Sequence, residues 1–486
     1  MPDRLIQPPD PAQPIPLYRQ LYNNLRAAIL TGRLKHGTRL PSTRELSESL
    51  NVSRNTVLNA FEQLLAEGYL ESAPASGTFV AMTLPETPSQ PAPRSGRVEK
   101  PRWSAIARAL TAAPAMHVGD PARKDAGHPR AFRVGLPALD AFPATLWARL
   151  VARRARHSDA RGLDYQATAG YRPLREAIAA HVTVSRQVRC TADQVVIVSG
   201  SQGALDLVAR LLVDPGDPVW MEDPGYLGAR GALVSAGAQI VPVPVDAEGL
   251  RVDVGRKRCP EARLAYLTPS HQFPLGVTLS LTRRLELLAW ARSAGAYLVE
   301  DDYDSEYRFH GRPLAALQGL DDSGRVIYVG TFSKTLFPAL RLGYLILPPA
   351  LIDTFLAARA FVDGHTAALE QGALTDFIVG GHFGRHLRRM RGLYAERRAT
   401  LLRALDGLPL EPFAADTGMH CIGWLPSGAD DAGVARAAAA HDVDVTPLSR
   451  FSLTAHARPG LLLGYAGVDP AGIRAGARRL ALALKG

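Results

Sequence analysis

The chain contains little cysteine. Among its 486 residues only Cys190, Cys259 and Cys421 occur, and they form neither a CxxC pair nor a cysteine–histidine cluster. This pattern excludes a disulfide framework and gives no sign of a zinc site. We therefore expect reduced, packed thiols and no bound metal.

Long apolar runs are also missing. The best candidate, LGYLILPPALIDTFLAA, is interrupted by Pro348, Pro349 and Asp353, whereas a membrane span needs about 18 uncharged residues. The first ten residues, MPDRLIQPPD, lack the apolar core of a signal peptide. We expect a cytoplasmic protein without a membrane partner.

The overall composition is that of a soluble globular protein, with 47% apolar and 21% charged residues. The formal charge of +10 and a pI near 9.7 favour polyanionic partners, although an arginine-rich proteome would give the same balance. A chain of 486 residues is long enough for two or three domains.

A proline-rich stretch divides the chain. LPETPSQPAPRSGRVEKP contains five prolines and shows no apolar periodicity, which is typical of an extended, semi-rigid linker. We predict a small domain over residues 1–82, a linker over 83–130 and a large domain over 131–486.

The small domain has the pattern of three helices followed by two short strands. A helix is predicted over residues 17–30, and Ser42 with Glu45 forms a capping box that opens the second helix. Ser53 caps the third helix, which ends at Gly68. The strands, joined through a turn that contains Gly77, complete a winged helix-turn-helix.

In such a domain the third helix lies in the major groove of DNA. Its first turn therefore supplies the candidate base contacts, and the wing tip and the second helix approach the backbone. A protein-docking role is the alternative, but the basic start of the recognition helix favours DNA. The DNA-binding candidates are Arg44, Ser53, Arg54, Asn55, Thr56, Gly77 and Thr78.

The small domain resembles the GntR family of bacterial winged-helix regulators. The resemblance is carried by PLYRQLYNNLRAAILTGRLKHGTRLPSTRELSESLNVSRNTVLNAFEQLLAEGYLESAPASGTFV. It implies binding to double-stranded promoter DNA.

The large domain alternates strand-like runs with helical stretches. VVIVSG, PVWMED, LAYLTPS, AYLVEDD, RVIYVG and YLILP are the apolar runs. This alternation predicts a three-layer α/β fold with a mostly parallel sheet.

Two turns after strands could bind a ligand. Ser201 and Gln202 follow VVIVSG and open a helix, where backbone amides and the helix dipole favour a phosphate. Tyr226, in EDPGY, could lie over a planar ring. An unliganded glycine turn and a core aromatic are the alternatives for these two features.

Acidic and basic groups follow two further strands. Asp301, the last residue but one of AYLVEDD, needs a cationic or hydrogen-bonding partner if it is buried, although magnesium ligands or a solvated turn are alternatives. In GTFSKTLFPALRLG, Lys334 has a hydroxyl on each side and Arg341 seven positions on. A lysine with a lowered pKa can form a Schiff base with an aldehyde, and the hydroxyls can bind phosphate.

Taken together, these pieces resemble the pyridoxal phosphate site of fold-type I aminotransferases, as do LDYQATAGYRPLREAIA, TPSHQFPLG and LLLGYAGVD. The resemblance implies pyridoxal 5'-phosphate as cofactor. Lys334 would form the Schiff base, Asp301 would bind the pyridine nitrogen, Tyr303 the phenolic oxygen, and Tyr226 would stack on the ring. The phosphate would be bound by Ser201, Gln202, Ser333 and Arg341.

The same resemblance implies a homodimer. Tyr165 lies where such enzymes reach into the phosphate site of the partner subunit, so active sites would be shared. His271 or Phe273 stands where an asparagine usually contacts the cofactor's oxygen.

The combination of both domains resembles the MocR subfamily of GntR regulators, which implies a sensor cofactor. The subfamily also shares a basic helix, here Arg385 to Arg398, which either contacts DNA or is a solvated surface helix. Two effector types follow from the resemblance, pyridoxal phosphate itself or an amino compound that forms an external Schiff base.

The choice between these effectors rests on missing arginines. Where γ-aminobutyrate sensors have carboxylate-binding arginines, this chain has Gly228 and Leu462, and Arg230 or Arg458 are the possible substitutes. We therefore expect the effector to be pyridoxal phosphate, with control of vitamin B6 synthesis genes. A catalytically active aminotransferase with a DNA-binding head is the alternative, and we expect at most residual transaminase activity.

Overall fold

A computed structural model describes residues 6–73, 76–84, 102–112, 130–309, 314–454 and 458–485. The chain forms two compact units, Met1–Pro101 and Arg102–Gly486. Most of the predicted linker lies outside the described residues. Its described part contains a helix, α4 (Ala105–Ala112), which belongs to the second unit and lies against α9 (Leu227–Ser235). The segment predicted as a linker is thus partly helical.

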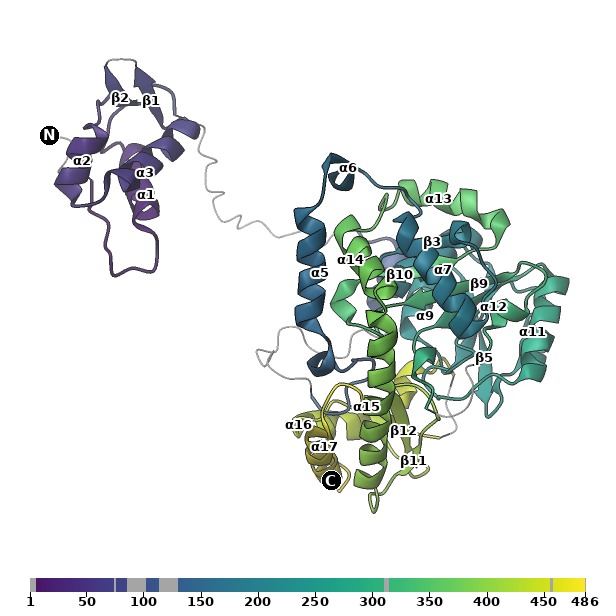
Figure 1. The fold of residues 1–486 in the computed structure, drawn as a ribbon. Helices are drawn as coiled ribbons and strands as arrows, with labels where there is room; N and C mark the ends of the chain where they lie inside the picture. The colour runs from purple at the N-terminus through teal and green to yellow at the C-terminus, as the bar shows by residue number, and fades with distance from the viewer. Residues whose placement is uncertain are drawn as a thin grey trace. The chain divides into compact units, whose positions relative to one another are not determined.

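The small unit is a winged helix (Figure 1). Its core consists of one apolar stripe from each helix, including Leu21, Leu46 and Phe61, which are all buried. The elements are α1 (Leu17–Leu30), α2 (Thr43–Leu50), α3 (Arg54–Ala66), β1 (Leu70–Ala73) and β2 (Gly77–Val80).

The large unit is built on an eight-stranded sheet. The strands β4, β5, β7, β8 and β9 run parallel, and β10 pairs antiparallel with both β9 and β3. In spatial order the strands are β3 (Val195–Val198), β10 (Gly343–Ile346), β9 (Val326–Thr331), β8 (Tyr297–Asp302), β7 (Leu264–Leu267), β4 (Pro218–Asp223), β5 (Gln239–Asp246) and β6 (Gly249–Leu250).

Helices cover both faces of this sheet, because successive residues of each buried strand point to opposite sides. Val196 and Val198 pack with α8 and α13, whereas Val195 and Ile197 pack with α7 and α14. The predicted three-layer fold is therefore confirmed. The helices are α5 (Ala144–Arg156), α6 (Ala160–Leu163), α7 (Arg172–Arg186), α8 (Gly200–Leu212), α10 (Val252–Arg258), α11 (Leu281–Ala294), α12 (Leu317–Leu320), α13 (Ile352–Ala360) and α14 (Ala368–Val379).

The C-terminal part adds a smaller antiparallel sheet and three helices. Its strands, in spatial order, are β11 (Glu411–Phe413), β12 (His420–Trp424), β14 (Gly460–Gly464) and β13 (Thr446–Pro447). The long helix α15 (His382–Ala404) packs against α17 (Pro470–Ala483), and α16 (Asp431–Ala440) contacts both α17 and β13. No helix among the described residues is long and apolar enough to cross a membrane.

Candidate functional site

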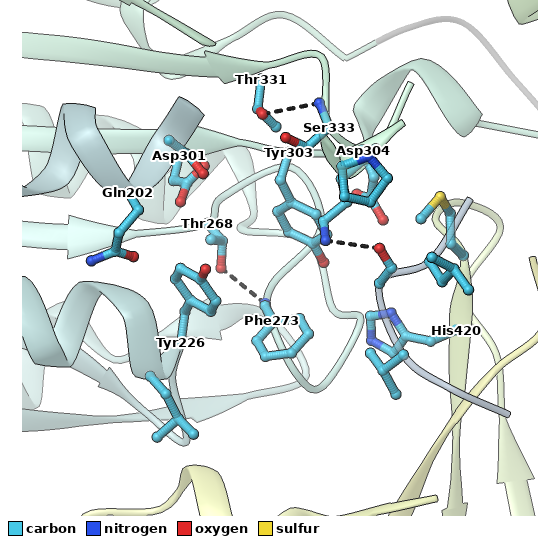
Figure 2. Close-up of a pocket in the computed structure, with 18 of the residues that line it drawn as sticks. Gln202, Tyr226, Thr268, Phe273, Asp301, Tyr303, Asp304, Thr331, Ser333 and His420 are labelled. Carbon is cyan, nitrogen blue, oxygen red and sulfur yellow. Dashed lines mark hydrogen bonds between the residues drawn. The ribbon is translucent and has the colours of Figure 1, made fainter. Parts of the chain in front are cut away.

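A cavity of about 690 Å³ opens at the carboxyl ends of the parallel strands (Figure 2). This edge of an open α/β sheet is where ligands bind in such folds. The walls come from the loop before α5, the first turn of α8, the ends of β7, β8 and β9, and the C-terminal sheet. The predicted residues that line it are Ser201, Gln202, Tyr226, Asp301, Tyr303, Ser333, Lys334 and Arg341.

Lys334 follows β9 and is half-buried at the cavity. Its Nζ donates a hydrogen bond to the carbonyl of Gly135 at 2.9 Å. A Cβ at Gly135 would lie 2.8 Å from Nζ and would displace the amine, and the φ of 77° at this position favours glycine. Burial lowers the pKa of Lys334, opposed by Asp304 and Asp301. A lowered pKa increases the share of neutral amine, the form that attacks an aldehyde.

Asp301 lies near the end of β8 with one oxygen paired and one unpaired. Tyr266 donates its hydroxyl to Oδ2 at 2.9 Å, whereas the buried Oδ1 has no hydrogen-bond partner among the described residues. Burial, with the neighbouring charge of Asp302, raises the pKa of Asp301 to about 7. An N–H donor in the cavity would satisfy Oδ1 and restore the charged form.

The first turn of α8 and Arg341 form an anion-binding corner. Ser201 and Gln202 lie in that turn, and Gln202 donates to the carbonyl of Gly228 at 3.0 Å. Arg341 has a φ of 53° and donates to the carbonyl of Ser199 at 3.0 Å. A helix N-terminus with an arginine beside it suits a phosphate group.

Aromatic side chains form the remaining wall of this corner. The rings of Tyr226 and Phe273 meet edge to face at 5.8 Å, and Phe273 meets Tyr303 at 6.0 Å. Burial, with the charge of Asp301, raises the pKa of Tyr226 to about 12, so its hydroxyl stays protonated. Of the two residues considered for the asparagine position, Phe273 lines the cavity, and His271 lies behind Tyr303.

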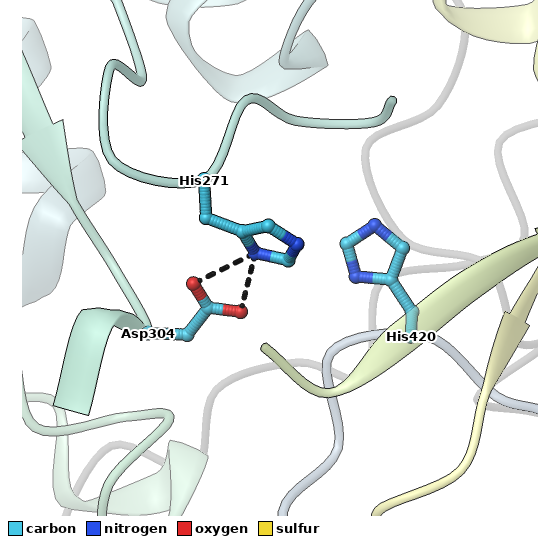
Figure 3. Close-up of side chains that lie close together, drawn as sticks. All are labelled: His271, Asp304 and His420. Atoms are coloured by element: carbon cyan, nitrogen blue, oxygen red, sulfur yellow. Dashed lines mark hydrogen bonds and ion pairs between the residues drawn. The ribbon is translucent and has the colours of Figure 1, made fainter. Parts of the chain in front are cut away.

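A buried cluster of His271, Asp304 and His420 (Figure 3) lies at the cavity, whose wall includes Asp304 and His420, and the sequence did not predict this cluster. The Nδ1 of His271 lies 3.0 Å from both carboxylate oxygens of Asp304 and from the hydroxyl of Tyr303. His420 donates from Nε2 to the carbonyl of Pro274 at 3.0 Å, and burial together with His271 lowers its pKa to about 3. The motifs TPSHQF and DDYDSE follow neighbouring strands, which indicates that His271 and Asp304 lie close together. His420 comes from a strand that is distant in the sequence, and no motif indicates its position.

Neither the two positions where γ-aminobutyrate sensors have arginines nor the two possible substitutes place an arginine in the cavity wall. A Cβ at Gly228 would lie 2.4 Å from the Tyr226 ring, and Leu462 is fully buried in β14. Arg458 pairs with Glu411 and lies over the ring of Trp424. Arg230 is not among the residues that line the cavity.

Tyr165 lies away from the cavity of its own chain. Its side chain is 93% exposed and meets only the ring of His365, at 6.3 Å, among the aromatic contacts of the described residues. A contribution to a site would therefore have to be to another copy of the chain.

In the small unit the predicted DNA-contacting residues lie on α2, at the start of α3 and in the wing. Ser53 accepts a hydrogen bond from the backbone of Thr56 at 3.1 Å, which starts α3. Arg54 and Asn55 are exposed on its first turn, and Arg44 pairs with Glu48 at 3.2 Å. At the wing, Gly77 has a φ of 110°, which other residues rarely adopt, and Thr78 follows it in β2.

Both units match known protein families. Residues 139–480 match Aminotransferase class I and II, and residues 17–80 match Bacterial regulatory proteins, gntR family. The fold and the cavity thus define a DNA-binding regulator with an aminotransferase-type domain.

Relatives define the group more closely. The chain is 45% identical to the probable rhizopine catabolism regulatory protein MocR of Rhizobium meliloti, over 96% of this chain and 93% of that protein. It is 30% identical to the pyridoxine biosynthesis regulator PdxR of Corynebacterium glutamicum, over 95% and 94%. The chain belongs to the MocR-type regulators of the GntR family.

A solved structure shows the relationship of the large unit to enzymes. LysN, an α-aminoadipate aminotransferase of Thermus thermophilus crystallised with N-(5'-phosphopyridoxyl)-L-leucine, superposes with a TM-score of 0.68 and 34% identity, over 73% of this chain and 91% of that chain. The fold implies pyridoxal 5'-phosphate as cofactor. The unpartnered Oδ1 of Asp301 fits this group, because a protonated pyridine nitrogen is the donor that it lacks.

Proposed function

We propose that this protein is a transcriptional regulator whose binding to promoter DNA depends on a small molecule held at the pyridoxal phosphate site. The observation that carries the proposal is the extent of the cavity. Its wall continues beyond the residues matched to the cofactor, through Leu227, Phe273, His420, Thr446 and Phe451. A volume of about 690 Å³ falls within the range of small-molecule sites, so an amino compound has room beside the cofactor.

We assign the cofactor contacts as the sequence resemblance implies. When bound, pyridoxal phosphate supplies an aldehyde that captures primary amines. Lys334 holds that aldehyde, Asp301 accepts from the pyridine nitrogen, Tyr303 donates to the phenolic oxygen and Tyr226 covers the ring. Ser201, Gln202, Ser333 and Arg341 bind the phosphate.

The DNA contacts are assigned to residues of α2, of the start of α3 and of the wing. Arg54, Asn55 and Thr56 would meet base edges in the major groove, and Arg44 a phosphate. Ser53 starts the helix, and Gly77 and Thr78 bring the wing close to the backbone. A regulator of this kind works where the chromosome lies, so we place it in the cytoplasm.

Two candidates remain for the chemical identity of the effector. The sequence favoured pyridoxal phosphate itself, and the relationship to a pyridoxine biosynthesis regulator supports that candidate. The additional cavity wall favours an amino compound instead, because the cofactor alone needs none of Leu227, Thr446 or Phe451. The more similar relative is a probable regulator of a catabolic pathway, and we put the amino compound first.

Transamination would be secondary in this protein. The sites assigned to Lys334 and Asp301 are compatible with proton transfer during a residual half-reaction. The C-terminal wall, however, offers Met419, His420, Thr446 and Phe451 and no arginine among the described residues. It lacks the group that would anchor an α-carboxylate from that side.

The test is DNA binding as a function of ligand. Full-length protein is titrated onto the promoter fragment of its own gene without cofactor, with pyridoxal phosphate, and with pyridoxal phosphate plus a panel of primary amines at constant salt. We expect at least one amine to change the Kd, and Lys334→Ala to lose that response while still binding DNA. A Kd that changes with pyridoxal phosphate alone would move the effector to the cofactor, and the same Kd under all conditions would refute sensing at this site.

A further inference from the structure

Two guanidinium groups line the cavity, although the cofactor carries one phosphate. Arg341 lies in the anion-binding corner beside the first turn of α8 and is assigned to the phosphate. Arg133, from the loop before α5, lines the cavity as well. No ion pair joins Arg133 to an acidic residue in the described part of the chain, so its charge is available to a ligand.

The backbone before Arg133 is hydrogen-bonded to the C-terminal part of the chain. Phe132 is fully buried with a φ of 71°, a conformation that bulky residues rarely adopt. Its carbonyl accepts a hydrogen bond from Gly464 at 2.9 Å, and the carbonyl of Ala131 accepts one from Asp444 at 3.0 Å. A Cβ at Gly464 would lie 2.2 Å from the carbonyl oxygen of Arg133, so the end of β14 is shaped to receive this segment. Strained backbone maintained in this way is characteristic of functional sites.

Arg133 and Lys334 line the same cavity, and the positive charge of Arg133 disfavours the protonated form of Lys334. Arg133 and Arg341 both contribute to the lowered pKa of Lys334, whose largest cause is burial. Of the two carboxylates in the cavity wall, Asp304 lies against His271 and Asp301 is matched to the pyridine nitrogen. Neither neutralises Arg133, and an anionic group of a ligand is the partner that remains.

We propose that Arg133 binds a carboxylate or sulfonate of the effector, whose amino group lies toward Lys334. The inference rests on the proposed function and narrows it, because it makes the effector an amino acid or aminosulfonic acid and not a simple amine. A planar guanidinium with paired donors matches such oxyanions. Arg133 would thus replace, from the loop before α5, the arginines that are missing at Gly228 and Leu462.

The test compares matched amines with and without an acidic group. Protein loaded with pyridoxal phosphate is titrated with β-alanine, 4-aminobutyrate and taurine, while the visible absorbance of the cofactor is followed. Propylamine, butylamine and ethylamine serve as counterparts without an acidic group. The variants are Arg133→Gln and Arg133→Lys. Arg256→Gln removes the same charge from an exposed position on α10 and serves as control.

We expect wild-type protein to bind at least one acidic amine about tenfold more tightly than its neutral counterpart, equivalent to ~1.4 kcal/mol. Arg133→Gln should remove this preference, Arg133→Lys should keep part of it, and Arg256→Gln should keep all of it. All variants should take up pyridoxal phosphate equally, because Arg341 binds the phosphate.

Four results would overturn the inference. Equal binding of acidic and neutral amines by wild-type protein would refute it and leave amine sensing intact, as would an undiminished preference in Arg133→Gln. Loss of pyridoxal phosphate uptake in Arg133→Gln would assign Arg133 to the cofactor. If no amine changes the absorbance, the amine-sensing function itself is wrong, and the inference fails with it.

Discussion

Burial acts in opposite directions on the two ionisable residues at the centre of the cavity. It lowers the pKa of Lys334 and raises that of Asp301 to about 7, because each loses hydration of its charged form. Burial thus shifts the Lys334 amine toward its neutral form, while the carboxyl of Asp301 stays incompletely hydrogen-bonded. Lys334 can thus react with an aldehyde, and Asp301 can accept one further hydrogen bond from a ligand.

The first prediction concerns the amine of Lys334. Lys334→Ala should lack the visible absorbance band that wild-type protein gains with pyridoxal phosphate, because no other lysine among the described residues lines the cavity. Borohydride reduction followed by peptide mass analysis should find the cofactor on Lys334 in wild-type protein only. Lys257→Ala, on the exposed face of α10, is the control. A band of full intensity in Lys334→Ala would remove this residue from its proposed role.

The second prediction is a pH dependence caused by Asp301. Between its ordinary pKa of 3.8 and the raised value of about 7, the folded carboxyl holds a proton that the unfolded chain has released. The folded state therefore binds more protons, and the free energy of unfolding falls as the pH rises through this window. The full effect is on the order of 4 kcal/mol.

Denaturant unfolding of cofactor-free protein at pH 5 and pH 8 measures this effect. Asp301→Asn should lose less stability than wild-type protein between the two pH values, and the comparison of the two proteins cancels contributions from other buried acids such as Glu222. Added pyridoxal phosphate should flatten the wild-type profile. Parallel profiles for the two proteins would contradict the assignment.

At the scale of elements, short polar signals define the DNA-binding helices. Ser42 and Glu45 form a complete capping box, and Ser53 caps α3, so both helices begin where the sequence predicts. The cap of α3 also determines which side chains are exposed on its first turn. Local hydrogen bonds thus position the recognition face.

The third prediction separates base readout from phosphate binding. Arg54→Ala should weaken binding to the promoter by about 1–3 kcal/mol and reduce its preference over unrelated DNA, because a base contact is lost. Arg44→Ala should weaken binding to both DNAs equally and reduce the slope of log K against log salt by about 1. Fluorescence anisotropy at several salt concentrations measures both effects. An unchanged preference in Arg54→Ala would exclude that arginine from readout.

The basic helix α15 is neither uniformly solvated nor uniformly basic. Arg397 is buried and donates to Asp140 at 2.7 Å, and Met390 and Tyr394 are packed on the same side. Arg388 and Arg389 are exposed on the other side. Contact of this exposed face with DNA stays a prediction.

At the scale of the whole molecule, the two units carry different binding partners in one chain. If a ligand in the cavity changes the affinity for DNA, then DNA must change the affinity for that ligand by the same factor. The coupling requires at least two conformations that differ in their affinity for both DNA and the ligand. We propose that contact with a second copy of the chain provides these conformations. Tyr165, whose side chain is 93% exposed, is the residue through which we propose that the copies share their sites.

The fourth prediction tests shared sites. Tyr165→Ala should lower the affinity for pyridoxal phosphate by about tenfold, equivalent to ~1.4 kcal/mol, because the partner's phosphate loses a hydroxyl donor. Tyr165→Phe should show the same loss, whereas Tyr18→Ala, on α1 of the small unit, should not. Equilibrium dialysis measures the affinity, and sedimentation shows whether each variant is a dimer.

Mixing variants sharpens this test. Tyr165→Ala combined with Lys334→Ala should regain a visible band at concentrations of pyridoxal phosphate at which neither variant shows one, because each mixed dimer contains one complete site. No recovery after subunit exchange would contradict sharing.

Sequence patterns alone predicted the winged helix and the three-layer sheet, whereas the cofactor was implied by the resemblance to fold-type I aminotransferases. Caps, apolar stripes and strand ends are local features, and local hydrogen bonds and side-chain periodicity are enough to specify them. Only the tertiary structure revealed that α4 lies within the predicted linker, that Phe273 and not His271 lines the cavity, and that Arg133 and His420 belong to its wall. These residues come from segments far apart in the chain, and burial and unpaired charge arise only when such segments are packed together.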